Sequence, residues 1–316
     1  MYPSKILLFG EYSILLNSYA LAMPYGKFQG DWAFMNDVVG YNPLEAHDSN
    51  RNLRVFLKHF KLIEKNQSLN YHLDITRFDK DIENGIYFKS NIPIGYGFGS
   101  SGALVAAIFD RYVNDQIQSR DDFRLKKSLA FLESFYHCTS SGIDPLVCYL
   151  NSPVLVKSNN EFEKLDLSID KVLQKNGLFL VDSGQKGKTS ELVSYFNQKC
   201  NSDIDYLNSI KNRYIPLNNE CIKEIIGQND SKHFFSLIHE LSSLQLLLFE
   251  KMIPRNFVPL MNYGIENDLF FLKLCGSGGG FFLGFSKNLV KTKEYFDKEG
   301  HEILIFQPVA RQIVGV

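Results

Sequence analysis

The chain has 316 residues and 45% of them are hydrophobic, so it can bury a sizeable core as one large domain or two smaller ones. Its 34 Lys and Arg residues nearly balance 35 Asp and Glu residues, which gives no support for a nucleic-acid or membrane-surface partner. The five cysteines show no CxxC pair and no metal-ligand spacing, a usage that fits a reducing cytosol. No signal peptide or membrane-spanning segment is expected, because apolar runs stay well short of about 20 residues.

Apolar runs near the N-terminus predict short strands. Residues 5–9 and 12–16 are apolar and flank Gly10-Glu11, which predicts two strands joined tightly. Lys5 opens the first of them, and a lone lysine at that place is ordinarily a solvated strand end. Further elements are predicted from their patterns: strands over 20–23, 71–76 and 86–91, and an amphipathic helix over 51–65.

The stretch PIGYGFGSSGA at 93–103 is where we expect the chain's chemistry to centre. Its glycines stand at alternate positions and permit positive φ and a close approach of the backbone to a ligand. A helix beginning at Ser100 or Ser101 would direct its free N–H groups and positive dipole end toward the loop. Such an arrangement holds phosphate without a lysine, although a glycine-rich turn that only connects a strand to a helix has the same pattern. The paired serine hydroxyls, which suit phosphate or Mg²⁺, favour a phosphate loop.

Two carboxylates stand out in the region that follows. Ser119 and Asp122 form a predicted capping box for a helix over about 120–137. Glu133 lies among apolar residues of that helix, where a glutamate usually takes the solvated face. Asp144 lies near the start of a short apolar helix, where an anion is stabilised and a helix cap is the commonest role. From the residues alone, both acidic side chains therefore have a structural alternative.

The second half of the chain predicts an α+β arrangement. Strands are predicted over 153–157, 177–182, 269–274, 281–285 and 301–307, and helices over about 188–199, 203–264 and 287–299. A domain boundary is expected near 160–175. Lys188 and Thr189 precede the first of these helices, where solvated lysines at a capped helix and a phosphate contact fit equally well. The glycine-dense turn at 276–280 joins two strands and is compatible with a bare hairpin.

Three of these stretches resemble motifs of the GHMP kinases, and among them of the mevalonate kinases. The loop at 93–103 resembles the central motif PxxxGLGSSA, with Phe98 and Gly102 as departures. The stretch KILLFGEYSILL is similar to a first motif close to KVILxGEHAVV, with Tyr12 where that family often has His. The stretch KLCGSGGG at 273–280 resembles the third motif, KLTGAGGGG.

A further string supports the mevalonate kinase resemblance. The spacing E-x-x-x-H-x-x-x-S-G-x-D from Glu133 to Asp144 matches that family without a gap, with Cys138 where the family commonly has Gly. The resemblance implies a two-lobed GHMP kinase fold with the active site between the lobes. It places an N-terminal nucleotide-binding α+β lobe at 1–165 and a ferredoxin-like α+β lobe at 166–316.

The resemblance also implies roles for single residues. Lys5 would lie beside the reacting groups, and Asp144 would face the acceptor hydroxyl as a base or as a positioning group. Ser101 and Glu133 would hold Mg²⁺. The residues implied in binding ATP are Pro93, Gly95, Gly97, Gly99, Ser100, Ser101, Gly102, Thr189 and Gly278.

The implied reaction is transfer of the γ-phosphoryl group of ATP to a small-molecule alcohol, most similar to the mevalonate kinase reaction of isoprenoid precursor synthesis. Phosphomevalonate is the nearest alternative acceptor, and Lys186 and Lys188 would suit its existing phosphate. The motifs of galactokinases and homoserine kinases match this chain less well, so galactose and homoserine are less favoured as acceptors. A GHMP-fold metabolite sensor without turnover is the alternative of another class. We expect a cytoplasmic monomer or homodimer with no nucleic-acid or membrane partner.

Overall fold

The computed structural model describes most of the chain in ten segments: residues 1–37, 42–64, 73–113, 122–137, 140–157, 161–166, 177–185, 187, 189–227 and 231–306. The chain divides into two compact units, each described here by itself. The first unit comprises Met1–Ile6, Met23–Ile94 and Phe98–Ser152, and the second comprises Leu7–Ala22, Gly95–Gly97 and Pro153–Val316. The division of the family fold at residue 165 stays a prediction.

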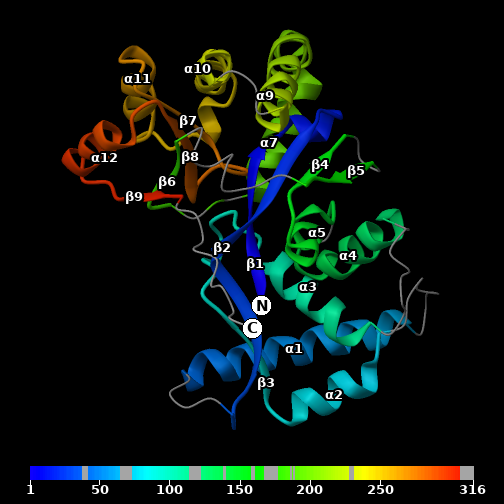
Figure 1. The fold of residues 1–316 in the computed structure, drawn as a ribbon. Helices are drawn as coiled ribbons and strands as arrows, with labels where there is room; N and C mark the ends of the chain where they lie inside the picture. The colour runs from blue at the N-terminus through cyan, green and yellow to red at the C-terminus, as the bar shows by residue number, and fades with distance from the viewer. Residues whose placement is uncertain are drawn as a thin grey trace. The chain divides into compact units, whose positions relative to one another are not determined.

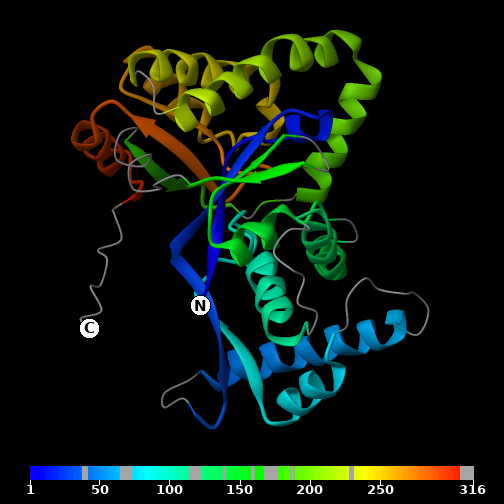
Figure 2. The same ribbon diagram turned by 45° about the vertical axis from the view of Figure 1, so that its right-hand side comes forward.

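In the part of the chain that the structure describes, the first unit contains strands β2 (Ala20–Phe34) and β3 (Ile86–Ser90), the first residues of β1 (Tyr2–Phe9) and five helices (Figure 1). Strand β2 pairs antiparallel with β3, in a register that sets Gly30 opposite Ser90. The helices are α1 (Pro43–Glu64), α2 (Ile75–Glu83), α3 (Ser100–Tyr112), α4 (Asp122–His137) and α5 (Ile143–Leu150). Figure 1 and Figure 2 both show α1 and α2 side by side against β3.

Aromatic side chains fill the core of the first unit. Phe56 and Phe60 of α1 stack with ring centroids 4.5 Å apart, and Phe78 of α2 stacks on Tyr112 of α3 at 4.2 Å. All four rings are buried, because the apolar faces of these amphipathic helices turn toward one another. Helices α3, α4 and α5 pack mutually, and this packing brings the first turns of α3 and α5 close to the C-terminal end of α4.

The second unit contains an antiparallel sheet in the order β7-β8-β6-β9. Its strands are β6 (Leu178–Asp182), β7 (Phe270–Leu274), β8 (Phe281–Ser286) and β9 (Ile303–Ile305). Gly284 lies opposite Phe179, and a Cβ at Gly284 would collide with the Phe179 ring. Glycine at this position therefore allows a large ring from β6 to lie across β8.

Helices cover both faces of this sheet. The helices of the second unit are α7 (Thr189–Ser202), α8 (Ile204–Ser209), α9 (Ile215–Gly227), α10 (Ser231–Leu248), α11 (Val258–Glu266) and α12 (Leu289–Lys298), with a π-helical turn at Ile210–Tyr214. Phe271 meets Phe235 of α10, whereas its neighbour Phe270 meets Phe296 of α12. Successive side chains of a strand point to opposite faces, so the two rings anchor helices on opposite sides.

Strands β1 (Tyr2–Phe9) and β2 each have residues in both units, because the division falls after Ile6 and after Ala22. The first residues of β2, Ala20 to Ala22, pair with β4 (Val154–Val156) in the second unit, and β4 pairs with β5 (Phe162–Lys164). The strand predicted over 20–23 is confirmed but extends to Phe34. Within the described ranges, none of the helices combines the length and the apolar character that a membrane crossing requires.

Two predicted strands are wrong. Residues 13–16 form a 3-10 turn (Ser13–Leu16), because Gly10 with φ 108° and Tyr12 with φ 57° turn the chain where an extended strand was expected. In the stretch 71–76, the described part enters α2, whose N-cap Asp74 accepts a hydrogen bond from the backbone N–H of Arg77. The predicted capping box at Ser119 lies outside the described residues.

Candidate active site

The glycine-rich loop and the first turn of α3 form the centre of the candidate site. Helix α3 begins at Ser100, and its N-cap Gly99 has the left-handed conformation (φ 66°, ψ 44°) without a side-chain cap. The first N–H groups of α3 thus point out of the helix beside its positive dipole end. The predicted start of this helix at Ser100 or Ser101 is confirmed. Pro93 is the first residue of the loop and has no N–H to offer a ligand.

Phe98 anchors this loop to the first unit. Its ring is buried and lies 5.1 Å from Phe28 and 6.1 Å from Tyr25, measured between ring centroids. Its carbonyl accepts the backbone N–H of Lys5 at 2.9 Å. Phe98, which stands where the family motif has leucine, therefore belongs to an aromatic cluster. Its carbonyl also connects the loop to Lys5 of β1.

Lys5 and Asp144 form an ion pair beside the loop. Lys5 Nζ lies 3.0 Å from Asp144 Oδ1, the lysine side chain is 8% exposed and the aspartate is 32% exposed. A Cβ at Gly99 would lie 2.8 Å from Lys5 Cγ and 3.3 Å from Asp144 Oδ2. A side chain at Gly99 would occupy the place of the pair, so glycine there lets the backbone reach both charged groups.

The position of Asp144 follows from close helix packing. Asp144 stands in the first turn of α5, whose N-cap Gly142 has φ 73°. A Cβ at Gly102 would lie 2.8 Å from the Asp144 carbonyl carbon and 2.9 Å from the nitrogen of Pro145. Gly102, where the family motif has alanine, thus lets α3 approach the start of α5 and brings the phosphate-loop helix against the carboxylate.

Glu133 lies in a buried cluster of oxygen donors. Ser101 Oγ lies 3.3 Å from Glu133 Oε1, and the Ser140 hydroxyl donates to Glu133 Oε2. Burial raises the pKa of the Glu133 carboxyl to about 7, and the charge of Asp144 adds to this, against the opposing effects of Ser140, Lys5 and Ser101. Glu133 is only 4% exposed, so the solvated position that is usual for a glutamate in such a helix is wrong for this residue.

His137 is a site residue to which the sequence patterns assigned no role. Its Nε2 atom lies 2.9 Å from Ser101 Oγ. The signal was present in the string Glu133-x-x-x-His137, because residues four apart share one face of a helix. Both side chains of α4 therefore reach the same serine of α3.

In the second unit, three loops converge on one another. The backbone N–H of Gly187 donates to the Gly95 carbonyl at 3.0 Å. A Cβ at Gly97 would lie 2.9 Å from the Cys275 carbonyl oxygen, and a Cβ at Gly280 would lie 2.8 Å from Tyr96 Cα. The glycines of the central and third motifs thus allow backbone-to-backbone contact. A bare hairpin turn does not account for this convergence of loops.

Thr189 and Gly278 lie at the same convergence. Thr189 is the first residue of α7, and its hydroxyl lies 2.7 Å from that of Ser277. Gly278 has φ 96°, and a Cβ there would collide with the carbonyl of Met252. Lys186 and Lys188, which would suit the existing phosphate of phosphomevalonate, lie outside the described residues.

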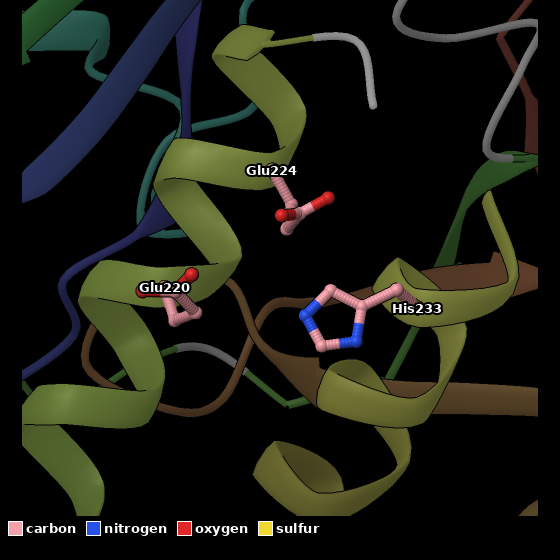
Figure 3. A group of neighbouring side chains, drawn as sticks. All are labelled: Glu220, Glu224 and His233. Atoms are coloured by element: carbon pink, nitrogen blue, oxygen red, sulfur yellow. The ribbon is translucent and has the colours of Figure 1, made fainter. Parts of the chain in front are cut away.

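A separate cluster of possible metal ligands lies on helices of the second unit (Figure 3). Glu220 and Glu224 extend from α9 and His233 from α10, with one ligand atom of each within 4.8 Å of the others. Glu220 Oε2 already lies 3.1 Å from Lys223 Nζ, and the His233 side chain is exposed. The cluster is thus typical of a solvated, charge-paired helix surface and shares no residue with the candidate site.

Comparison with known proteins identifies the type of enzyme. The family model of the GHMP kinases N terminal domain matches residues 58–151. A mevalonate kinase of Pyrococcus abyssi (strain GE5 / Orsay) is 24% identical over 294 residues, which cover 88% of this chain and 85% of that protein. The chain carries the N-terminal domain of the GHMP kinases. Its similarity to mevalonate kinases over most of its length indicates a phosphotransferase with an alcohol acceptor.

Solved structures of GHMP kinases share the fold. A mevalonate kinase of L. major in complex with R-mevalonate aligns with a TM-score of 0.65 at 15% identity, over 96% of this chain and 93% of that one. A Streptococcus pneumoniae phosphomevalonate kinase in complex with phosphomevalonate and AMPPNP aligns with a TM-score of 0.62 at 16% identity, over 96% and 97%. The predicted GHMP kinase fold is confirmed. These likenesses are nearly equal, so fold similarity does not select between the two acceptors.

Proposed function

We propose that this GHMP kinase transfers the γ-phosphoryl group of ATP to the hydroxyl of mevalonate, giving 5-phosphomevalonate. The observation that carries the proposal is the Lys5–Asp144 pair, whose Nζ and Oδ1 atoms lie 3.0 Å apart beside the left-handed Gly99. A carboxylate and an ammonium group directly at the mouth of an uncapped helix N-terminus suit an acceptor hydroxyl and a developing phosphoryl charge. The relative from Pyrococcus abyssi, which matches most of this chain, is a mevalonate kinase.

Each part of the first unit then has one task. The N–H groups at the start of α3 bind phosphate oxygens, which they suit because no side chain caps them. Asp144 Oδ2 orients the acceptor hydroxyl and takes its proton late, once transfer of the phosphoryl group has made the hydroxyl acidic. Lys5 holds the other carboxylate oxygen and offsets negative charge at the reacting oxygens. In the second unit, Thr189 donates its hydroxyl to a phosphate oxygen.

The donor set at Glu133 fits Mg²⁺. Ser101 Oγ and the Glu133 carboxylate are hard oxygen donors 3.3 Å apart, and Mg²⁺ prefers such ligands while keeping several waters. Ser101 can donate its proton to Glu133 or His137 and still offer a lone pair. Ser101 and Glu133 would therefore hold the ion, which supplies positive charge at the transferred phosphate when bound.

The deciding experiment is an ADP-release assay with Mg²⁺-ATP and one acceptor at a time: mevalonate, phosphomevalonate, galactose or homoserine. We expect the highest kcat/KM with mevalonate. A higher kcat/KM with phosphomevalonate would contradict mevalonate as the acceptor and identify the protein as a phosphomevalonate kinase. Absence of turnover with all four acceptors would contradict the proposal and support a metabolite sensor.

The role of Asp144 has its own test. The Asp144→Asn variant should lose about 100-fold or more in kcat, the scale of a general-base contribution, while ATP still binds. Asp79→Asn is a matched control, because Asp79 pairs with Lys61 in the same unit and both side chains are partly exposed. That control should keep wild-type turnover. An Asp144→Asn enzyme with near-normal kcat would remove Asp144 from the reaction.

A further inference from the structure

Tyr12 has an unusual backbone conformation for a large residue. Its φ is 57° and its ψ is −44°, in the region that favours glycine. A bulky side chain at positive φ is a rare outlier, and such backbone strain persists where the surrounding structure imposes it. The first family motif often has His at this position, so the tyrosine belongs to this chain's own variant of the motif.

The phenol of Tyr12 makes a specific contact far along the sequence. Its hydroxyl donates to the backbone carbonyl of Ser277, 265 positions away in the third glycine-rich motif. The side chain is 5% exposed, and burial raises the pKa of its phenol well above the usual value. The phenol therefore stays protonated and remains a hydrogen-bond donor under all ordinary assay conditions.

The ring of Tyr12 touches a second element. Its centroid lies 5.1 Å from that of Phe196, on the buried face of α7, and 5.3 Å from that of Phe249. Helix α7 begins at Thr189, whose hydroxyl lies 2.7 Å from the Ser277 hydroxyl. One side chain thus contacts the helix that carries Thr189 and the turn that carries Ser277, and these two meet through their hydroxyl groups.

We propose that Tyr12 is a positioning residue that holds the Ser277 turn against the start of α7 and so aims the Thr189 hydroxyl at the phosphate. This inference rests on the proposed function, in which Thr189 contacts a phosphate oxygen. Ser277 has two parts in the arrangement: its carbonyl accepts from Tyr12, and its hydroxyl fixes Thr189. Without the Tyr12 hydroxyl, the turn loses this hydrogen bond, and the Ser277 and Thr189 hydroxyls are no longer held at their observed positions.

The test uses Tyr12→Phe, which removes the phenol oxygen and keeps the ring packing on Phe196 and Phe249. We expect kcat to fall about fivefold, since one hydrogen bond is worth about 1 kcal/mol and 1.4 kcal/mol is a factor of ten, while KM for ATP stays within about twofold. In a Thr189→Ala background the same change should have no further effect on kcat. An equal loss in both backgrounds would overturn the proposal, because independent effects multiply.

Tyr206→Phe is the matched control. Tyr206 is also 5% exposed, its hydroxyl donates to the Leu248 carbonyl at 3.1 Å, and its ring also contacts Phe196. It should lower the melting temperature about as much as Tyr12→Phe and leave kcat unchanged. A kcat loss of the same size in both variants would show a general effect of stability and would contradict positioning by Tyr12.

A second measurement does not depend on turnover. Hydrogen exchange of the backbone amides at 276–280 should become faster in Tyr12→Phe and stay at the wild-type rate in Tyr206→Phe. Unchanged exchange at 276–280 in Tyr12→Phe would overturn the inference. If the wild-type protein turned over none of the four acceptors, the proposed function would fail, while the exchange experiment would still decide whether Tyr12 holds the turn.

Discussion

A buried ion pair within the second unit offers a quantitative test of how the first and third motifs are held together. Lys273 Nζ donates to Glu11 Oε1 and, at 2.7 Å, to the carbonyl of Leu274, and it lies 5.4 Å from the centroid of the Phe9 ring. The lysine side chain is 1% exposed and that of Glu11 is 0% exposed. The pair joins residues 262 positions apart in the sequence.

Replacing Lys273 with Met keeps an unbranched side chain and removes the charge. The Glu11 carboxylate then loses its cation in a buried site, and the free energy of unfolding should fall by about 3–5 kcal/mol, the usual cost of breaking a buried pair on one side. For a domain of this size the melting temperature should drop by roughly 10 °C. The double variant Glu11→Gln with Lys273→Met buries no charge and should recover more than half of the loss.

Urea unfolding of the wild type, both single variants and the double variant measures this coupling. Far-UV circular dichroism follows the whole chain, and the fluorescence of the single tryptophan, Trp32, reports on the first unit. Lys293→Met is the control, because Lys293 pairs with Asp297 in the same unit with about half of each side chain exposed. It should change stability by less than about 1 kcal/mol. A Lys273→Met protein as stable as this control would refute the reasoning.

Two further predictions concern the first unit. Gly102→Ala places a Cβ 2.8 Å from the Asp144 carbonyl carbon, so it should lower both the melting temperature and kcat, whereas Gly26→Ala, where a Cβ meets nothing within 4 Å, should change neither. A normal melting temperature and kcat for Gly102→Ala would disprove the close packing. Glu133→Gln should raise the Mg²⁺ concentration for half-maximal activity severalfold at fixed ATP, as a ligand with less charge binds the ion more weakly. An unchanged Mg²⁺ dependence would exclude Glu133 as a ligand.

Local patterns were reliable where one segment determines its own conformation. The helix at Ser100, the strands β3, β6, β7 and β8 and the short helix before Leu150 were all predicted within a few residues. They failed at 12–16 because an apolar run fits a strand and a 3-10 turn equally well. The positive φ of Tyr12, which breaks the strand, has no signature in a side chain that ordinarily avoids it.

The sequence by itself determined the order of the motifs, the glycine-rich loop before a serine-headed helix and the residue types that phosphoryl transfer requires. Only the tertiary structure decided which distant groups meet: Lys5 with Asp144 at 3.0 Å, Lys273 with Glu11, and Tyr12 with the carbonyl of Ser277. The physical reason is that hydrogen bonds within a helix or turn follow from neighbouring residues. A contact across 265 positions depends on how packed elements bring two segments together, and no local pattern encodes it.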